Sequence, residues 1–120
     1  MAEHVTRQIS PDLLLAEFSV VCEALIASGS SCVTLMFGWG SELDIDEMWK
    51  KQFVAMSDVR GVVAEAVSQG ILTIGQADIH IQVPDFEFKL CHESDMHISG
   101  SLPLVEQLSR RWASLGYSRN

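Results

Sequence analysis

The chain has 120 residues, of which 48% are hydrophobic and 20% charged, a composition typical of a single folded domain rather than a disordered chain. Eight Lys and Arg residues stand against sixteen Asp and Glu residues, which gives a net charge of −8. Phosphate backbones and anionic membranes repel such a chain, so we expect neither a nucleic acid nor a membrane as its partner. A basic protein partner fits this charge. We predict one domain over residues 1–120.

The chain has three cysteines, Cys22, Cys32 and Cys91. Their number is odd, their spacings are unrelated, and no Cys-x-x-Cys pair occurs, so neither a disulfide framework nor a zinc or redox motif is indicated. The first apolar run, residues 13–26, carries two glutamates and is too short to span a bilayer. We therefore expect reduced thiols and a cytoplasmic location.

The first expected element is a long helix. Residues 1–9 have no periodic pattern and read as a loose end, and so do residues 117–120. Ser10 and Pro11 form an N-cap followed by a first-turn proline, which predicts a helix over residues 11–28 that ends at Gly29. Apolar residues surround most of this helix, which favours a homodimer that buries it.

The middle of the chain predicts a strand and further helices. Residues 31–37 are apolar and β-branched, as in a buried strand. Asp44 and Glu47 fit a capping box, which predicts a helix from there to about residue 56, and a second helix follows over residues 57–70. A strand is expected from Ile71, with Gly75 at a bulge.

The second half of the chain predicts a three-stranded antiparallel meander. A two-residue turn at Pro84-Asp85 pairs Val83 with Phe86, and a three-residue turn at residues 93–95 pairs Leu90 with Ile98. A last helix follows over about residues 101–115. The fold class expected is α+β: a two-layer sandwich with a mostly antiparallel sheet and helices packed on one face.

The meander's other face would be polar, with Asp78, Cys91 and His97 in one cross-strand row. A thiol beside an imidazole can act as a nucleophile, so these three residues are the catalytic candidates. In this row, however, Asp78 flanks the thiol instead of orienting the base, and would raise the thiol pKa. The pattern therefore does not predict an enzyme.

A metal site would combine His80, His92 and His97, with Cys91 or Asp95 as a further ligand. In the expected register His92 and His97 face opposite sides of the sheet. The spacing also matches no standard zinc pattern. We therefore expect no metal and no cofactor.

Two functional hypotheses follow. The first is a small acidic protein-binding domain, an immunity- or antitoxin-type inhibitor or a regulatory adaptor, that engages a basic partner. The alternative is a small enzyme or ligand-binding domain, with its site at the Asp78–Cys91–His97 row or in a pocket between the sheet and the first helix. Three tryptophans would line that pocket: Trp39, Trp49 and Trp112. The residues expected to contact a protein partner are His80, Asp85, Glu87, Lys89, Glu93 and Asp95.

Overall fold

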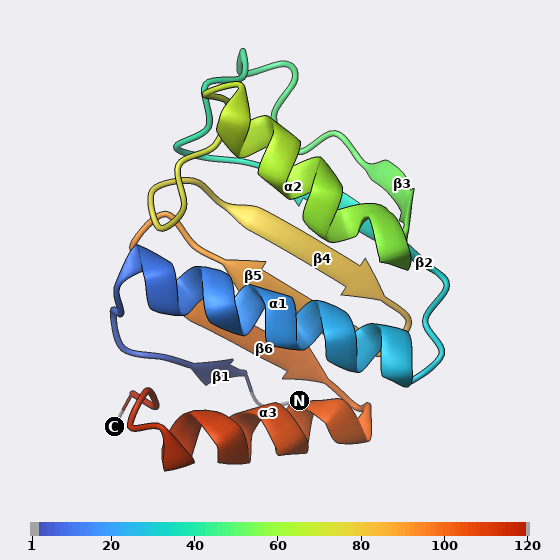
Figure 1. The fold of residues 1–120 in the computed structure, drawn as a ribbon, viewed down its shortest axis with the longest axis vertical. Helices are drawn as coiled ribbons and strands as arrows, with labels where there is room; N and C mark the ends of the chain where they lie inside the picture. Colours follow the sequence, from blue (N-terminus) through green and yellow to red (C-terminus); the bar gives the residue numbers. More distant parts are fainter. Residues whose placement is uncertain (1–2, 120) are drawn as a thin grey trace.

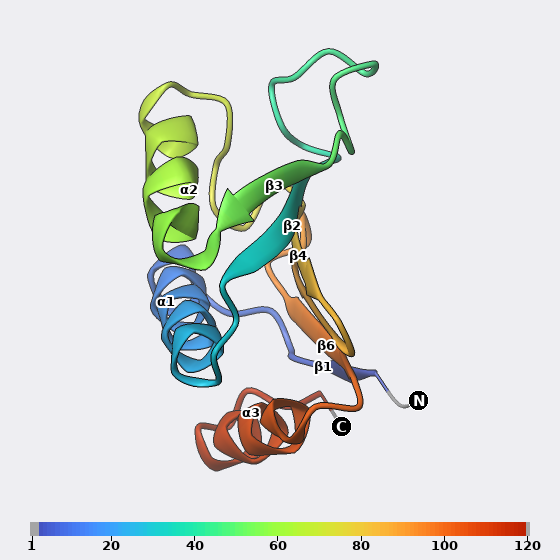
Figure 2. The ribbon, with the colours of Figure 1, turned by 90° about the vertical axis from the view of Figure 1, so that its right-hand side faces the viewer.

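The computed structural model describes residues 3–119 and consists of one antiparallel sheet covered on one face by three helices (Figures 1 and 2). The strand order is β1-β6-β5-β4-β2-β3. This arrangement confirms the α+β sandwich. In chain order the elements are β1 (His4–Val5), α1 (Pro11–Ala27), β2 (Cys32–Phe37), β3 (Gln52–Ala55), a 3₁₀ turn (Met56–Asp58), α2 (Val59–Ser68), β4 (Ile79–Val83), β5 (Phe86–Leu90), β6 (Met96–Gly100) and α3 (Pro103–Ser114).

Helix α1 begins where its capping residues predict. The backbone N–H of Leu13 donates to Ser10 Oγ at 3.4 Å, and Pro11 occupies the first helical position. The helix places one side against the sheet, where Leu14, Phe18, Val21, Cys22 and Leu25 are buried. No helix among residues 3–119 is both long and apolar enough to cross a membrane.

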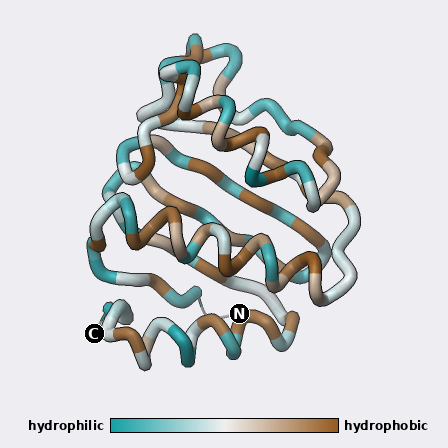
Figure 3. The backbone as a smooth tube through the Cα atoms, viewed as in Figure 1, coloured by the Kyte–Doolittle hydropathy of each residue, from teal (hydrophilic) through white to brown (hydrophobic). Residues whose placement is uncertain are grey.

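The core lies between the sheet and the helix layer. Apolar residues alternate with polar ones along β4, β5 and β6, and Figure 3 shows this alternation along the strands. The inward set is buried because each member points toward the helices. Its members in the meander are Ile79, Ile81, Phe86, Phe88, Leu90, Met96 and Ile98.

The first hairpin of the meander has the predicted register. Val83 pairs with Phe86 and Ile79 with Leu90, as the turn at Pro84-Asp85 requires. Asp85 has a φ of 64°, a left-handed conformation that aspartate tolerates in tight turns better than most residues.

The predicted register of the second hairpin is wrong. Leu90 pairs with Met96 instead of Ile98, so β6 is shifted by two residues. The connection is longer than expected and is closed by the Cys91 N–H, which donates to the Asp95 carbonyl at 2.9 Å. Because the side-chain period of a strand is two, this shift leaves every residue on its expected face and changes only its partners.

The helix predicted over residues 44–56 is absent, and residues 38–51 form a loop followed by β3. Only a single turn forms at Asp44, whose carbonyl accepts from the N–H groups of Glu47 and Met48. The chain then turns back at Trp49, which has a φ of 65° and donates its N–H to the Phe37 carbonyl at 2.7 Å. Pairing with β2 therefore prevails over the weak helical tendency of a short isolated segment.

The strand predicted from Ile71 is also wrong. Residues 71–78 form turns, in which the N–H groups of Ile71 and Leu72 donate to the Ala66 carbonyl, and that of Ala77 donates to the Thr73 carbonyl. Gly75, with a φ of 86°, lies in this turn region and not at a strand bulge.

The terminal segments are ordered parts of the sheet layer, contrary to the prediction of loose ends. Val5 pairs with His97, Thr6 and Ile9 are buried, and Thr6 forms a bridge with Ser118. The predicted loose ends also included residues 1, 2 and 120, which lie outside the described residues.

Candidate functional site

All three helices lie on one side of the sheet, and the opposite side, here called the open face, carries none among residues 3–119 (Figure 2). Alternate strand residues point to this face and form cross-strand rows. The first row is Met36, His80, Lys89, His97 and Val5; the second is Phe53, Thr34, Gln82, Glu87 and Ser99.

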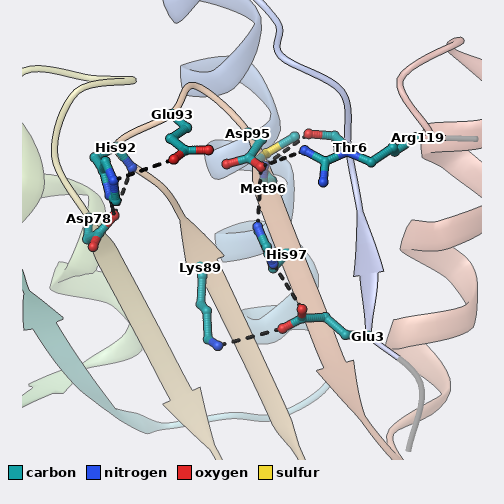
Figure 4. Close-up of polar contacts among 10 residues, drawn as sticks. All are labelled: Glu3, Thr6, Asp78, Lys89, His92, Glu93, Asp95, Met96, His97 and Arg119. Carbon is teal, nitrogen blue, oxygen red and sulfur yellow. Dashed lines mark hydrogen bonds and ion pairs between the residues drawn. The ribbon is translucent and has the colours of Figure 1, made fainter.

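A chain of polar contacts runs across the open face (Figure 4). His97 Nδ1 lies 3.0 Å from Glu3 Oε1, and this hydrogen bond lowers the pKa of Glu3. Lys89 Nζ lies 3.6 Å from Glu3 Oε2 and 3.2 Å from Glu87 Oε1. Gln82 in turn donates to Glu87. The charges on this face are therefore largely paired with one another.

The Asp78–Cys91–His97 row is not formed. Asp78 binds His92, accepting from its backbone N–H at 2.7 Å and contacting Nδ1 at 2.9 Å, while His97 lies opposite Lys89. The hydrogen bond to Asp78 raises the pKa of His92. The predicted row is wrong because it depended on the register of the second hairpin.

Cys91, Asp95 and His97 do come together where β5 ends and β6 begins. One ligand atom from each lies within 4.8 Å of the other two. Asp95 is only 4% exposed. Its Oδ2 lies 3.3 Å from His97 Nε2 and 3.2 Å from the Arg119 guanidinium, whereas its Oδ1 is buried with no hydrogen-bond partner among the described residues.

The Cys91 thiol is poorly suited to nucleophilic catalysis. Burial, followed by the nearby carboxylates of Asp95 and Asp78, raises the pKa of Cys91 to about 12. The thiolate is the reactive form of cysteine, so at neutral pH this side chain is held in its unreactive state.

Of the residues expected to contact a partner, all but Asp95 lie at least partly on the surface. His80, Glu87 and Lys89 lie half-buried on the open face, and Asp85 and Glu93 are exposed in turns. Asp95, by contrast, is buried and presents no contact surface, which corrects its assignment.

Trp49 covers part of the open face. Its ring centroid lies 4.8 Å from that of His80, with the planes at 61°. Burial lowers the pKa of His80, so this imidazole is neutral at physiological pH.

Three large apolar side chains that the sequence did not single out as surface residues are exposed: Trp39 at 51%, Ile45 at 74% and Phe53 at 76%. Trp39 and Ile45 belong to the loop of residues 38–51, which projects on the helix-free side of the sheet (Figure 2), and Phe53 shares the open face with Thr34. Ile45 and Phe53 both fall within the helix that the sequence predicts from Asp44 to about residue 56, which does not form. The aromatic and β-branched pair Phe53-Val54 is the local signal that could have identified the edge strand.

The predicted pocket lined by tryptophans is also wrong. A cavity of about 330 Å³ lies between α1 and α2, lined mainly by Leu15, Phe18, Val63, Val67 and Ile74. Trp112 is buried in the core, Trp39 is exposed in the loop of residues 38–51, and Trp49 packs against His80 on the open face.

Comparisons of the chain with models of known protein families, with curated proteins and with solved structures found no match.

Proposed function

We propose that this chain is a non-enzymatic protein-binding domain that engages a basic protein through one surface, the binding patch. The patch consists of the exposed apolar residues Trp39 and Ile45 of the loop of residues 38–51, the exposed Phe53 of β3, and the exposed acidic residues of the loop: Glu42, Asp44, Asp46 and Glu47. The observation that carries the proposal is the exposure of three large apolar side chains in the loop of residues 38–51 and in the strand that follows it, together with four exposed carboxylates of that loop. An immunity- or antitoxin-type inhibitor or a regulatory adaptor is the class of protein that we propose.

The composition of the binding patch supports a protein partner. Tryptophan and other large apolar residues supply much of the binding energy in protein interfaces, and surrounding polar groups exclude water from them. Ile45 and Phe53 are each about three-quarters exposed, so neither contributes much to the core.

The charge of the binding patch favours a partner rich in Lys and Arg. Its four carboxylates lie within six residues of one another, and in that stretch only Glu47 has a basic partner, Lys50 at 3.1 Å, among the described residues. Complementary charge accelerates association and makes it sensitive to salt. We further propose a cytoplasmic location, because the exposed Cys32 thiol suits a reducing compartment.

Photo-crosslinking from defined positions tests this proposal. A photoreactive amino acid at position 53 should capture a basic protein in the host cell, and the same residue at Leu15 on α1 should not. Leu15 is a matched control because it is also a large apolar residue, 46% exposed, on the helix side. Equal capture from both positions would contradict the proposal.

Variants of the binding patch should then weaken the identified complex. Ile45→Ser and Phe53→Ser should each weaken binding at least tenfold if they are central contacts, while Leu15→Ser should leave it unchanged. The triple variant Asp44→Asn, Asp46→Asn and Glu47→Gln should slow association and flatten its salt dependence. A partner that is acidic, or binding that ignores all these changes, would refute the proposal.

A homodimer through α1 stays a separate proposal. Leu13, Leu15 and Ile26 are exposed on α1 at 40%, 46% and 42%. Light scattering across a range of concentrations should show a dimer that Leu15→Glu dissociates. A monomer at all concentrations, or a dimer indifferent to Leu15→Glu, would exclude this arrangement.

A further inference from the structure

We propose that Cys91, Asp95 and His97 form a binding site for a divalent transition-metal ion, with Zn²⁺ as the best match. The site lies at the end of the open face where β5 passes into β6. It is independent of the protein-binding proposal, because none of its ligands belongs to the binding patch.

The ligand types and their spacing fit zinc. Thiolate sulfur, imidazole nitrogen and carboxylate oxygen are its usual ligands, at about 2.0–2.3 Å in tetrahedral geometry. Such geometry places ligand atoms roughly 3.5 Å apart. His97 Nε2 and Asp95 Oδ2 are 3.3 Å apart, and all three ligand atoms lie within 4.8 Å of one another. A contraction of about 1 Å would complete the set.

The Asp95 carboxylate gives an independent indication of a missing partner. It is 4% exposed, and Oδ1 makes no hydrogen bond with any described residue. Buried polar atoms normally have a partner, and a buried carboxylate oxygen without one is costly. A cation that Asp95 binds through both carboxylate oxygens would satisfy Oδ1 as well as Oδ2.

The contacts of the two His97 ring nitrogens also support a metal ion at this site. Its Nδ1 contacts Glu3 at 3.0 Å and its Nε2 contacts Asp95 at 3.3 Å, so both ring nitrogens face carboxylates. A neutral imidazole can donate from only one nitrogen. A metal ion at Nε2 would let Nδ1–H donate to Glu3, which is the carboxylate–histidine–metal arrangement found around many protein zinc ions.

The charges of the site balance on metal binding. The Cys91 S–H bond is lost, a sulfur–zinc bond forms, and the proton passes to solvent. The resulting thiolate and the Asp95 carboxylate together neutralise Zn²⁺. Arg119, whose side chain is 55% exposed, now occupies Asp95 Oδ2 at 3.2 Å and would move away. Three protein ligands leave a fourth position for water or for a donor from another molecule.

Titration of the untagged full-length chain with Co²⁺ and Zn²⁺ tests the proposal. Co²⁺ should produce a thiolate-to-metal charge-transfer band and tetrahedral d–d bands, which one equivalent of Zn²⁺ abolishes. Cys91→Ser should remove the charge-transfer band, and the control Cys32→Ser should retain it. Absence of the band in the wild-type chain, or its loss in both variants equally, would overturn the proposal.

Two variants outside the ligand set give a second, quantitative test. Glu3→Gln should weaken Zn²⁺ binding about 10-fold, because it removes the hydrogen bond that orients His97. Arg119→Gln should tighten binding, because it removes the cation that competes for Asp95. Both residues are exposed, so these variants should remain folded even if Asp95→Asn does not. Zn²⁺ affinity unchanged in both would refute the site as described.

Discussion

The guanidinium of Arg111 on α3 donates two hydrogen bonds to the carboxylate of Glu17 on α1, at 2.9 and 2.8 Å. Glu17 is only 3% exposed and is one of the buried residues of α1. The pair joins two helices that are far apart in the sequence, and it supplies the buried carboxylate with paired donors in a favourable fork geometry.

Arg111→Met should lower the free energy of unfolding by about 2 kcal/mol, because it leaves Glu17 buried and unpaired. The cost is below that of a fully enclosed pair, since the Arg111 side chain is 43% exposed. Urea unfolding measures the difference in free energy of unfolding between Arg111→Met and the wild type. The control Arg110→Met removes an exposed pair with Glu106 and should cost less than about 0.5 kcal/mol. Equal losses in the two variants would contradict this account.

His80 and His92 should titrate at different pH values in an NMR titration. His92 should titrate above the ordinary value of 6.5 because its hydrogen bond to Asp78 raises its pKa, and His80 should titrate below 6.5 because of burial. Asp78→Asn should bring the pKa of His92 down. The reverse order of the two histidines would contradict the geometry.

The same shifts set the direction of the pH dependence of stability. The folded pKa of His92 is raised, so its contribution is complete below pH 6.5 and is lost as pH rises through the raised pKa. The folded pKa of His80 is lowered, so this residue destabilises the fold as pH falls through 6.5. A His80→Gln variant should therefore lose less stability than the wild type between pH 7 and pH 5, as measured by urea unfolding.

Cys32 should react with iodoacetamide faster than Cys22 and Cys91. Cys32 is exposed and should be alkylated first, whereas burial raises the pKa of Cys91 to about 12 and that of Cys22 to about 11. Mass spectrometry of peptides from the folded chain measures the three rates. Alkylation of Cys91 as fast as Cys32 would restore it as a catalytic candidate.

Gly38→Ala should destabilise the fold by about 1–3 kcal/mol, because the added Cβ would overlap the ring of Trp49. Displacement of Trp49 should also shift the NMR signals of His80. Gly61→Ala is the control: Gly61 lies in α2, where a Cβ meets nothing within 4 Å, so the change should stabilise by about 0.5–1 kcal/mol. If both variants destabilise alike, Trp49 does not pack as described.

The parts of the fold that could be predicted from the sequence are those set by neighbouring residues. Ser10 and Pro11 predict the start of α1, and the alternation around Pro84-Asp85 predicts the first hairpin with its register. The sequence predicts the wrong register for the second hairpin because two turns that differ by two residues bury the same apolar set. Only the actual closure between Cys91 and Asp95 distinguishes them.

Features that depend on distant contacts could not be predicted. The capping pattern of Asp44 and Glu47 does produce one helical turn, but the turn does not extend into a helix because β3 pairs with β2 instead. At the candidate metal site, Cys91, Asp95 and His97 are close in sequence, so the sequence can indicate them. Glu3 and Arg119 come from segments without any periodic pattern. Glu3 and Arg119 contact His97 and Asp95 only because the folded chain places its two terminal segments beside β6.

The pairing of β1 with β6 has a consequence for the order of folding. Thr6 and Met96 exchange hydrogen bonds across 90 residues of chain, and Glu3 reaches His97 across 94. Closing so long a loop is entropically expensive and is repaid only after the intervening elements have packed. The hairpins should therefore form early, and the contacts of β1 with β6 around Asp95 should form last. Pairing of β1 with β6 would then be the slowest phase of refolding.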